Sequence, residues 1–170
     1  MTSGLLPTQP AGVSQQLVIR SLERGLAALD LRRFAGRDVD VDVFVQAGNE
    51  GFVKEFLVSW MKAHGIRMVP KDPELRLKVF ATALGTDRGE TLVGLPAFQA
   101  PILNVPFPEI ALFKWVRNRG QTELRVFAFD GNTDEFVDQL PPGVGRSKLD
   151  DFTLLLFIGF STSDLDTPVP

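Results

Sequence analysis

The chain of 170 residues contains no cysteine, no tyrosine and a single histidine. Without cysteine, disulfides, zinc–thiolate centres and cysteine nucleophiles are excluded. Fourteen phenylalanines stand against two tryptophans, and because phenylalanine has no polar tip this favours apolar contact over a hydrogen-bonding site. A surplus of positive charge is also missing: the net charge is −3 and the pI about 5.2. We therefore expect no nucleic-acid partner. We also expect no cofactor.

Length and composition indicate one globular domain, since 44% of the residues are hydrophobic and 23% are charged. Residues 1–13 are small, proline-containing and uncharged, which is typical of a flexible tether. They lack the basic start and the long apolar core of a signal peptide. We expect the domain to span residues 14–160 and a loose polar tail to follow over residues 161–170.

Hydrophobic periodicity predicts two helices. Leucine and valine recur at helical spacing over residues 14–30, and a second apolar stripe runs from Phe52 to Met61 and ends at Gly65. Alternating or continuous apolar residues predict strands, the last of them buried on both faces. The expected strands cover residues 37–45, 66–69, 75–84, 122–129, 135–140 and 151–160, with a loop at 85–89 and turns at 130–132 and 141–145.

This order predicts an α/β (α+β) fold. The early strand–helix–strand succession suits parallel neighbours, and the later strands suit antiparallel pairing. The simplest architecture is a mixed sheet with two main helices packed on it, in a single domain.

The most unusual stretch is residues 92–113, LVGLPAFQAPILNVPFPEIALF, with fourteen apolar side chains, four prolines and one charge. The prolines exclude a membrane-spanning helix. Because exposed apolar area costs roughly 25 cal/mol per Å², this insertion must cover the domain's own sheet or dock on something else. The predicted docking residues are Leu95, Phe98, Ile102, Leu103 and Phe107.

A short basic and aromatic run, KWVRNR, follows directly. Lys114, Trp115 and Arg117 could form a basic rim to the apolar surface, suited to anionic lipid headgroups. The simpler interpretation is a solvated edge of the sheet.

Candidate chemical groups are few. Asp38, Asp40 and Asp42 lie on one face of a strand, but same-face neighbours are about 6.5–7 Å apart, so one strand alone cannot enclose a cation. The simpler interpretation is a solvated face. His64 stands at a helix end without an orienting acid or a nucleophile nearby in sequence. We predict no catalytic residue and no metal site.

Asp130, Asn132 and Asp134 resemble the opening of a calcium-binding loop. The sixth position of that loop should be glycine but is Glu135, and the twelfth should be glutamate but is Pro141. A hairpin turn is the better interpretation, because Asp-Gly between strands is a common turn signal.

Several short motifs resemble a family of small bacterial outer-membrane lipoproteins of unassigned role. More distantly, they resemble the curli-secretion lipoprotein and the amino-terminal domain of the Tol-Pal β-propeller protein. The segments that carry the resemblance are SQQLVIRSLERGLAALDL from Ser14, FAGR from Phe34, PEIALF from Pro108 and FDG from Phe129. The resemblance implies a mixed α/β domain, export to the periplasm, a lipidated cysteine before the mature sequence, and assembly with partners at the outer membrane.

The leading hypothesis is therefore a periplasmic, membrane-tethered interaction or assembly module rather than an enzyme, docking on a protein partner, another copy of the chain or a lipid surface through the apolar insertion. A carrier of an apolar ligand, with the insertion as a pocket wall, is the alternative. A metal-dependent hydrolase using the strand aspartates is the weaker one. For location, the outer membrane's periplasmic face is expected and the cytoplasm is the alternative.

Overall fold

The computed structural model describes residues 11–46, 50–99 and 105–168. Two α-helices and one short 3-10 helix come from the first part of the chain: α1 (Ala11–Ala27), η1 (Leu31–Phe34) and α2 (Glu50–Ala63). The strands are β1 (Asp38–Val45), β2 (Arg67–Met68), β3 (Leu75–Leu95), β4 (Phe98–Gln99), β5 (Pro106–Phe107), β6 (Ile110–Asp130), β7 (Phe136–Gln139), β8 (Gly143–Leu154) and β9 (Ile158–Ser163).

The main sheet has the order β2-β1-β3-β6-β8-β9, and β7 pairs with β6. β1 runs parallel to β2 and β3, whereas every later pair is antiparallel. β4 and β5 form a separate two-stranded sheet. The predicted mixed sheet with two main helices is thus confirmed, including the change from parallel to antiparallel pairing.

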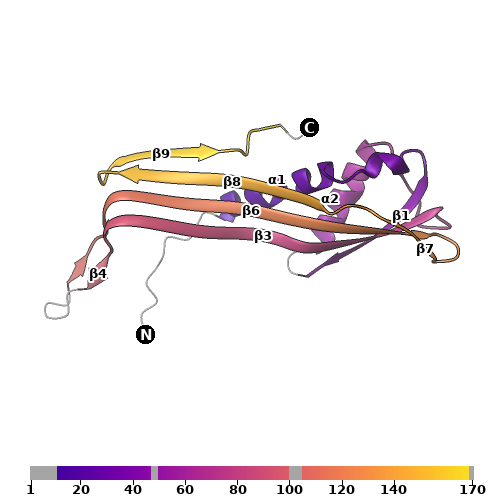
Figure 1. Cartoon of the computed structure of the whole chain (residues 1–170), viewed down its shortest axis with the longest axis horizontal. Coiled ribbons are helices and arrows are strands. Elements are labelled where there is room, and N and C mark those ends of the chain that lie inside the picture. Colours follow the sequence, from indigo (N-terminus) through magenta and orange to yellow (C-terminus); the bar gives the residue numbers. More distant parts are fainter. Residues whose placement is uncertain (1–10, 47–49, 100–104, 169–170) are drawn as a thin grey trace.

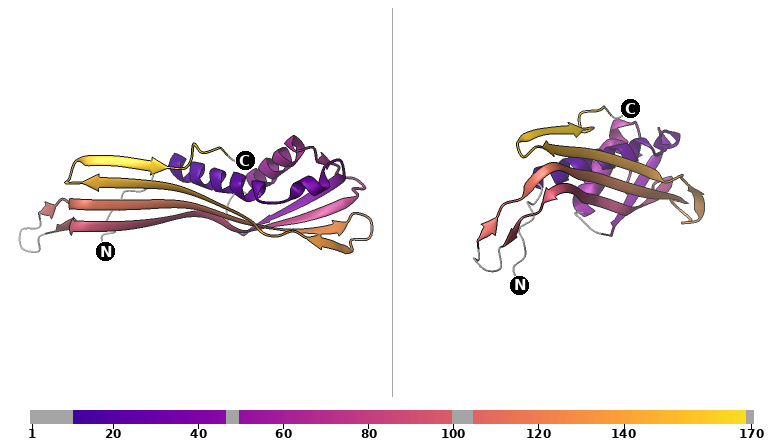
Figure 2. Two further views of the ribbon diagram at one scale, coloured as in Figure 1. Left: turned by 45° about the horizontal axis from the view of Figure 1, so that its top comes forward. Right: turned by 60° about the vertical axis from the view of Figure 1, so that its left-hand side comes forward.

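The sheet is much longer than the helices that cover it. β3 and β6 have 21 residues each and pair along almost their whole length. The helices lie at one end, and four strands continue past them as a narrow extension (Figures 1 and 2). We call this extension the arm; it comprises residues 85–95 of β3, 110–120 of β6, 148–154 of β8 and the whole of β9.

The hydrophobic core lies between the helices and the other half of the sheet. The alternation in β1 buries Val39, Val41 and Val43 on the helix side and leaves its aspartates partly exposed. α2 contributes Leu57 and Met61 to the same core. The predicted end of α2 is also confirmed, because Gly65 has a φ of +80°, a conformation that glycine adopts without strain.

α1 packs where the arm begins, and small residues of the sheet let it approach closely. Ser147 Oγ donates a hydrogen bond to the Leu17 carbonyl oxygen at 2.7 Å, and the Ser21 and Thr122 hydroxyls are also 2.7 Å apart. All four of these residues are buried. The base of the arm is therefore fixed to the helical layer, and the rest of the arm extends beyond it.

Two predictions of secondary structure, one near the start and one in the middle of the chain, are wrong. α1 covers residues 11–27 rather than 14–30, so residues 11–13 are helical and not part of a tether; residues 1–10 lie outside the described residues. The predicted loop at 85–89 is continuous strand within β3. Thr86, Asp87 and Arg88 are exposed on this arm strand, and both glycines are half-buried. No packed core demands apolar alternation there.

The C-terminal predictions also change. The predicted turn at 141–145 contains the start of β8 at Gly143, and the predicted strand at 151–160 is the end of β8, a turn and the first half of β9. That segment is not buried on both faces: Phe157 is 81% exposed and Phe160 50%. The expected loose tail begins with strand residues 161–163, and Asp164 forms an ion pair with Arg24 at 2.7 Å.

Candidate functional site: the apolar end of the arm

Large apolar side chains gather, exposed, at the end of the arm that lies farthest from the helices. They come from three segments of the chain: the end of β3 with β4, the stretch from β5 into β6, and the β8–β9 hairpin. We call them the arm-end residues: Val93, Leu95, Phe98, Val105, Phe107, Ile110, Leu112, Leu155, Leu156, Phe157, Ile158 and Phe160.

Backbone pairing holds these segments side by side. Leu95 pairs with Ile110 across β3 and β6. The turn after β8 closes onto the start of β6, because the Leu155 N–H donates to the Leu112 carbonyl oxygen at 2.9 Å and the Leu156 N–H to that of Ala111 at 3.0 Å. Residues more than forty positions apart in sequence therefore form one apolar surface.

The β8–β9 turn carries two leucines in an unfavourable conformation. Leu155 and Leu156 have φ values of +48° and +73°, and their side chains are about half exposed. For a residue with a branched side chain the left-handed region costs about 1–2 kcal/mol, and neither side chain recovers that cost by burial. Glycine or asparagine would suit these positions better. Both leucines therefore keep a strained backbone conformation without burying their side chains.

One face of the arm carries an aromatic row across three strands. Trp115, Phe152 and Phe160 lie on the same face by the strand register. Their rings stack with centroids 5.7 Å and 4.9 Å apart. Nearer the helices, the Arg117 guanidinium lies 4.6 Å from the Trp115 ring, a cation–π distance. We call this the aromatic face; α1 packs against the opposite one.

On the same face, next to the aromatic row, Asp150 accepts hydrogen bonds from both Trp115 and a second arginine, Arg119. Arg119 donates to both Asp150 carboxylate oxygens, at 2.7 and 3.1 Å, and Trp115 Nε1 donates to one of them at 3.2 Å. Burial alone would raise the pKa of Asp150, but the hydrogen bonds from Arg119 and Trp115 and the Arg119 charge outweigh it and hold the pKa below its usual range. The carboxylate is therefore ionised and orients the indole.

The opposite face carries Lys114 rather than the aromatic row. Its ammonium group lies 2.8 Å from Glu109 and 3.2 Å from Glu90. Burial lowers the pKa of Lys114, but the two glutamates raise it by more, so the net pKa lies above its usual value. Lys114 is thus paired within the chain, and the predicted basic rim is divided: Trp115 and Arg117 lie on one face and Lys114 on the other, because alternate strand residues point to opposite faces.

Three of the five predicted docking residues are among the described residues. Leu95, Phe98 and Phe107 are exposed at the arm end, whereas Ile102 and Leu103 lie outside the described residues. The alternative in which the insertion covers the domain's own sheet is wrong for its described residues, because most of its large apolar side chains are exposed and its ends are strands of the arm. Of these residues Ala111 is buried.

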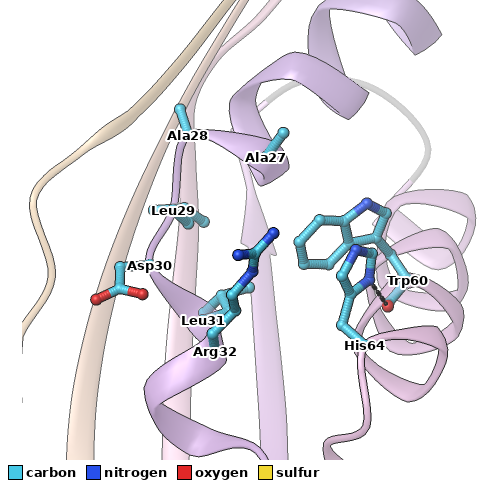
Figure 3. Close-up of a pocket in the computed structure, with 8 residues that line it drawn as sticks. All are labelled: Ala27, Ala28, Leu29, Asp30, Leu31, Arg32, Trp60 and His64. Atoms are coloured by element: carbon cyan, nitrogen blue, oxygen red, sulfur yellow. Dashed lines mark hydrogen bonds between the residues drawn. The ribbon is translucent and has the colours of Figure 1, made fainter. Parts of the chain in front are cut away.

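The arm-end residues line neither of two clefts that lie among the described residues. Phe98 and Phe107 stack on one another with centroids 5.0 Å apart, across the small β4–β5 sheet. One cleft, of about 250 Å³, lies between the end of α1 and α2, where Arg32 points toward the stacked Trp60 and His64 rings (Figure 3). The other lies along α1 and the segment after β9.

Asp38, Asp40 and His64, which the sequence offered as candidate chemical groups, have structural partners. Asp38 pairs with Arg67 at 2.7 Å and Asp40 lies 4.0 Å from Arg76. The ring Nδ1 of His64 is 2.8 Å from the Trp60 carbonyl oxygen. In residues 11–46, 50–99 and 105–168, no group of three or more histidine, aspartate or glutamate side chains is arranged to hold a metal ion.

Asp130 supports the predicted hairpin turn between β6 and β7. Its Oδ1 accepts hydrogen bonds from the Thr133 and Asn132 N–H groups, both at 2.9 Å. These bonds lower the pKa of Asp130 from its usual value. The turn interpretation of this motif is confirmed by the pairing of β6 with β7.

Sequence reasoning missed the contribution of the β8–β9 hairpin to the candidate site. The run LLLFIGF looks like buried core because it has no polar break. The available signal was weak: Gly159 lies inside the run, and Asp150 and Asp151 precede it. The turn itself falls on Leu155 and Leu156, residue types that do not indicate a turn.

Comparison with known proteins adds no family to this description: no family model matches the chain, and no curated protein matches it significantly. Among the described residues, no helix combines the length and the apolar character needed to cross a membrane.

Proposed function

We propose that this protein is an interaction or assembly module that docks through the arm-end residues, with a binding rather than a catalytic role. The observation that carries the proposal is the gathering of exposed apolar residues from three chain segments at one end of a hydrogen-bonded sheet. Contiguous exposed apolar surface of this kind marks interaction sites, and leaving it in water costs roughly 25 cal/mol per Å². The ordered strands beneath it reduce the entropy that docking must overcome.

We further propose that the module works at the periplasmic face of the outer membrane, tethered by a lipidated cysteine that precedes the mature sequence. The resemblance to small outer-membrane lipoproteins supports this location. Metabolic labelling of the product of the complete gene with a radioactive fatty acid tests it. Incorporation that disappears when the acceptor cysteine is replaced by serine is the expected result, and an unlabelled product would contradict the tether.

The docking proposal is tested by removing the tip without disturbing the sheet. Because Leu95 pairs with Ile110, residues 96–109 can be replaced by an Asn-Gly turn that closes the β3–β6 hairpin. Light scattering after size-exclusion chromatography then gives the mass of each protein in buffer and in dodecyl maltoside micelles. We expect the intact chain to associate in buffer and to bind detergent as a monomer. The shortened chain should show much less association and much less bound detergent.

Phe136→Ser provides the matched control, because Phe136 is an exposed aromatic residue at the opposite end of the molecule. This variant should behave like the intact chain. If the intact chain is a detergent-free monomer in both conditions, the arm end is not a docking surface. Circular dichroism confirms that each variant keeps its secondary structure.

A further inference from the structure

The chemical character of the side chains changes in steps along the length of the arm. Beyond the aromatic row, the described residues of the arm end, 93–99, 105–112 and 155–158, include one charged residue, Glu109, and it pairs with Lys114. Next come the stacked rings of Trp115, Phe152 and Phe160. The cations follow, two and four residues farther along β6. The order from the tip inward is therefore apolar, aromatic, basic.

The basic layer carries cations on the aromatic face that have no ion-pair partner among the described residues. Arg117 and Lys148 lie on this face by the strand register, and in the described part of the chain neither of them has a carboxylate within ion-pair distance. Arg117 donates a hydrogen bond to Thr91 Oγ1 at 3.2 Å and lies over Trp115. Arg119 alone in this layer is paired, with Asp150.

The spacing of these layers suits the boundary of a bilayer. Successive same-face positions on a strand are about 6.5–7 Å apart, so Arg117 stands roughly 13 Å from the row of Phe113 and Leu154. Interfacial proteins bury apolar residues by about 5–10 Å, place tryptophan at the headgroup level and extend arginine and lysine to the headgroups. An apolar protein partner would give no reason for this ordered change along the arm.

We infer that the end of the arm inserts into the surface of an anionic lipid bilayer, with the arm-end residues beyond the aromatic row in the outer acyl region, Trp115 at the headgroup level and Arg117 and Lys148 against the lipid phosphates. This inference rests on the proposed docking function and identifies what the arm end docks on. It also gives the strained leucines of the β8–β9 turn a role, because their side chains lie at the point of insertion.

Tryptophan fluorescence tests the insertion directly, because the chain has two tryptophans in different places. Trp60→Phe leaves Trp115 on the arm, and Trp115→Phe leaves Trp60 on α2. Each variant is titrated with vesicles of phosphatidylcholine containing phosphatidylglycerol, and with bromine-labelled lipid as a quencher. We expect Trp115 emission to shift to the blue and to be quenched, and Trp60 emission to change little.

The paired substitution Leu155→Asn with Leu156→Gly separates contact from structure. It removes the backbone strain of two leucines with positive φ, so the melting temperature should rise. The affinity of the protein for vesicles should fall at least tenfold. Arg117→Gln and Lys148→Gln should each weaken binding to anionic vesicles about fivefold, with little effect on vesicles of phosphatidylcholine alone. Lys54→Gln, on the exposed face of α2, is the charge control.

Unchanged Trp115 emission with anionic vesicles would overturn the inference, as would undiminished vesicle binding by the two-leucine variant. If the intact chain associates through the arm end in buffer but does not bind vesicles, the arm end docks on protein: the lipid inference fails while the docking function stands. If the tip-shortened chain associates and binds detergent as the intact chain does, the docking function itself fails.

Discussion

Adding one methyl group at Gly145 should displace α1 from the base of the arm. A Cβ built on Gly145 would lie 1.8 Å from the Ser21 carbonyl oxygen and 2.4 Å from the Gly25 nitrogen. Both neighbours are backbone atoms of α1, so no side chain can rotate out of the way. Ordinary contact begins at 3.4 Å, and the helix and strand would therefore have to separate by roughly 1.6 Å.

That separation loosens the packing of Leu17, Leu22 and Leu26, which α1 buries almost completely. Overpacking of a close contact costs typically 1–3 kcal/mol, and we expect Gly145→Ala to lower the free energy of unfolding by about 3 kcal/mol because the clash is with backbone. The melting temperature should fall by about 6–12 °C for a domain of this size. Urea denaturation followed by circular dichroism measures the change, with the slope m unchanged.

Gly85→Ala is the matched control, since nothing lies within 4 Å of a Cβ at Gly85. Both glycines are strand residues outside the left-handed region, so alanine causes no backbone strain at either. The control should change stability by less than about 1 kcal/mol, and loss of glycine's freedom in the unfolded chain favours a small gain. Equal stability of the two variants would refute the close packing of α1 on the sheet.

Three further predictions follow from the core and the arm. Leu77→Ala removes a fully buried side chain and should cost about 2–5 kcal/mol in urea denaturation. Asp150→Asn should destabilise the protein at neutral pH. Because the folded pKa of Asp150 is depressed, its contribution is complete above the unfolded value near 3.9 and disappears as pH falls through the folded pKa. Urea midpoints of variant and wild type should therefore converge in acid. Ser21→Ala removes the hydrogen bond to Thr122 and should cost about 1 kcal/mol by thermal denaturation.

Local patterns predicted the helical half of the molecule well. The alternation in β1, the apolar stripe of α2 and the glycine that ends it depend on period and backbone preference, which are properties of short segments. The hairpin at Asp130 was predictable for the same reason, because the aspartate oxygen satisfies nearby N–H groups whatever the rest of the chain does.

Predictions failed where they assumed that apolar residues are buried. Residues 151–160 look like core, yet Phe157 and Phe160 are exposed, because their place in the arm lies beyond the reach of the helices. Conversely, the polar, glycine-containing stretch 85–89 looks like a loop but is strand, because it pairs with residues 117–121 of β6. Strand pairing between distant segments can override local propensity.

The amino-acid sequence by itself determined the fold class, the positions of most strands and helices, and the presence of an apolar segment too large to be an ordinary surface loop. Only the tertiary structure decided that this segment is the tip of an arm and that the β8–β9 hairpin joins it. The physical reason is that period and propensity act over a few residues, whereas exposure depends on which distant strands pair and how far the helices extend over them.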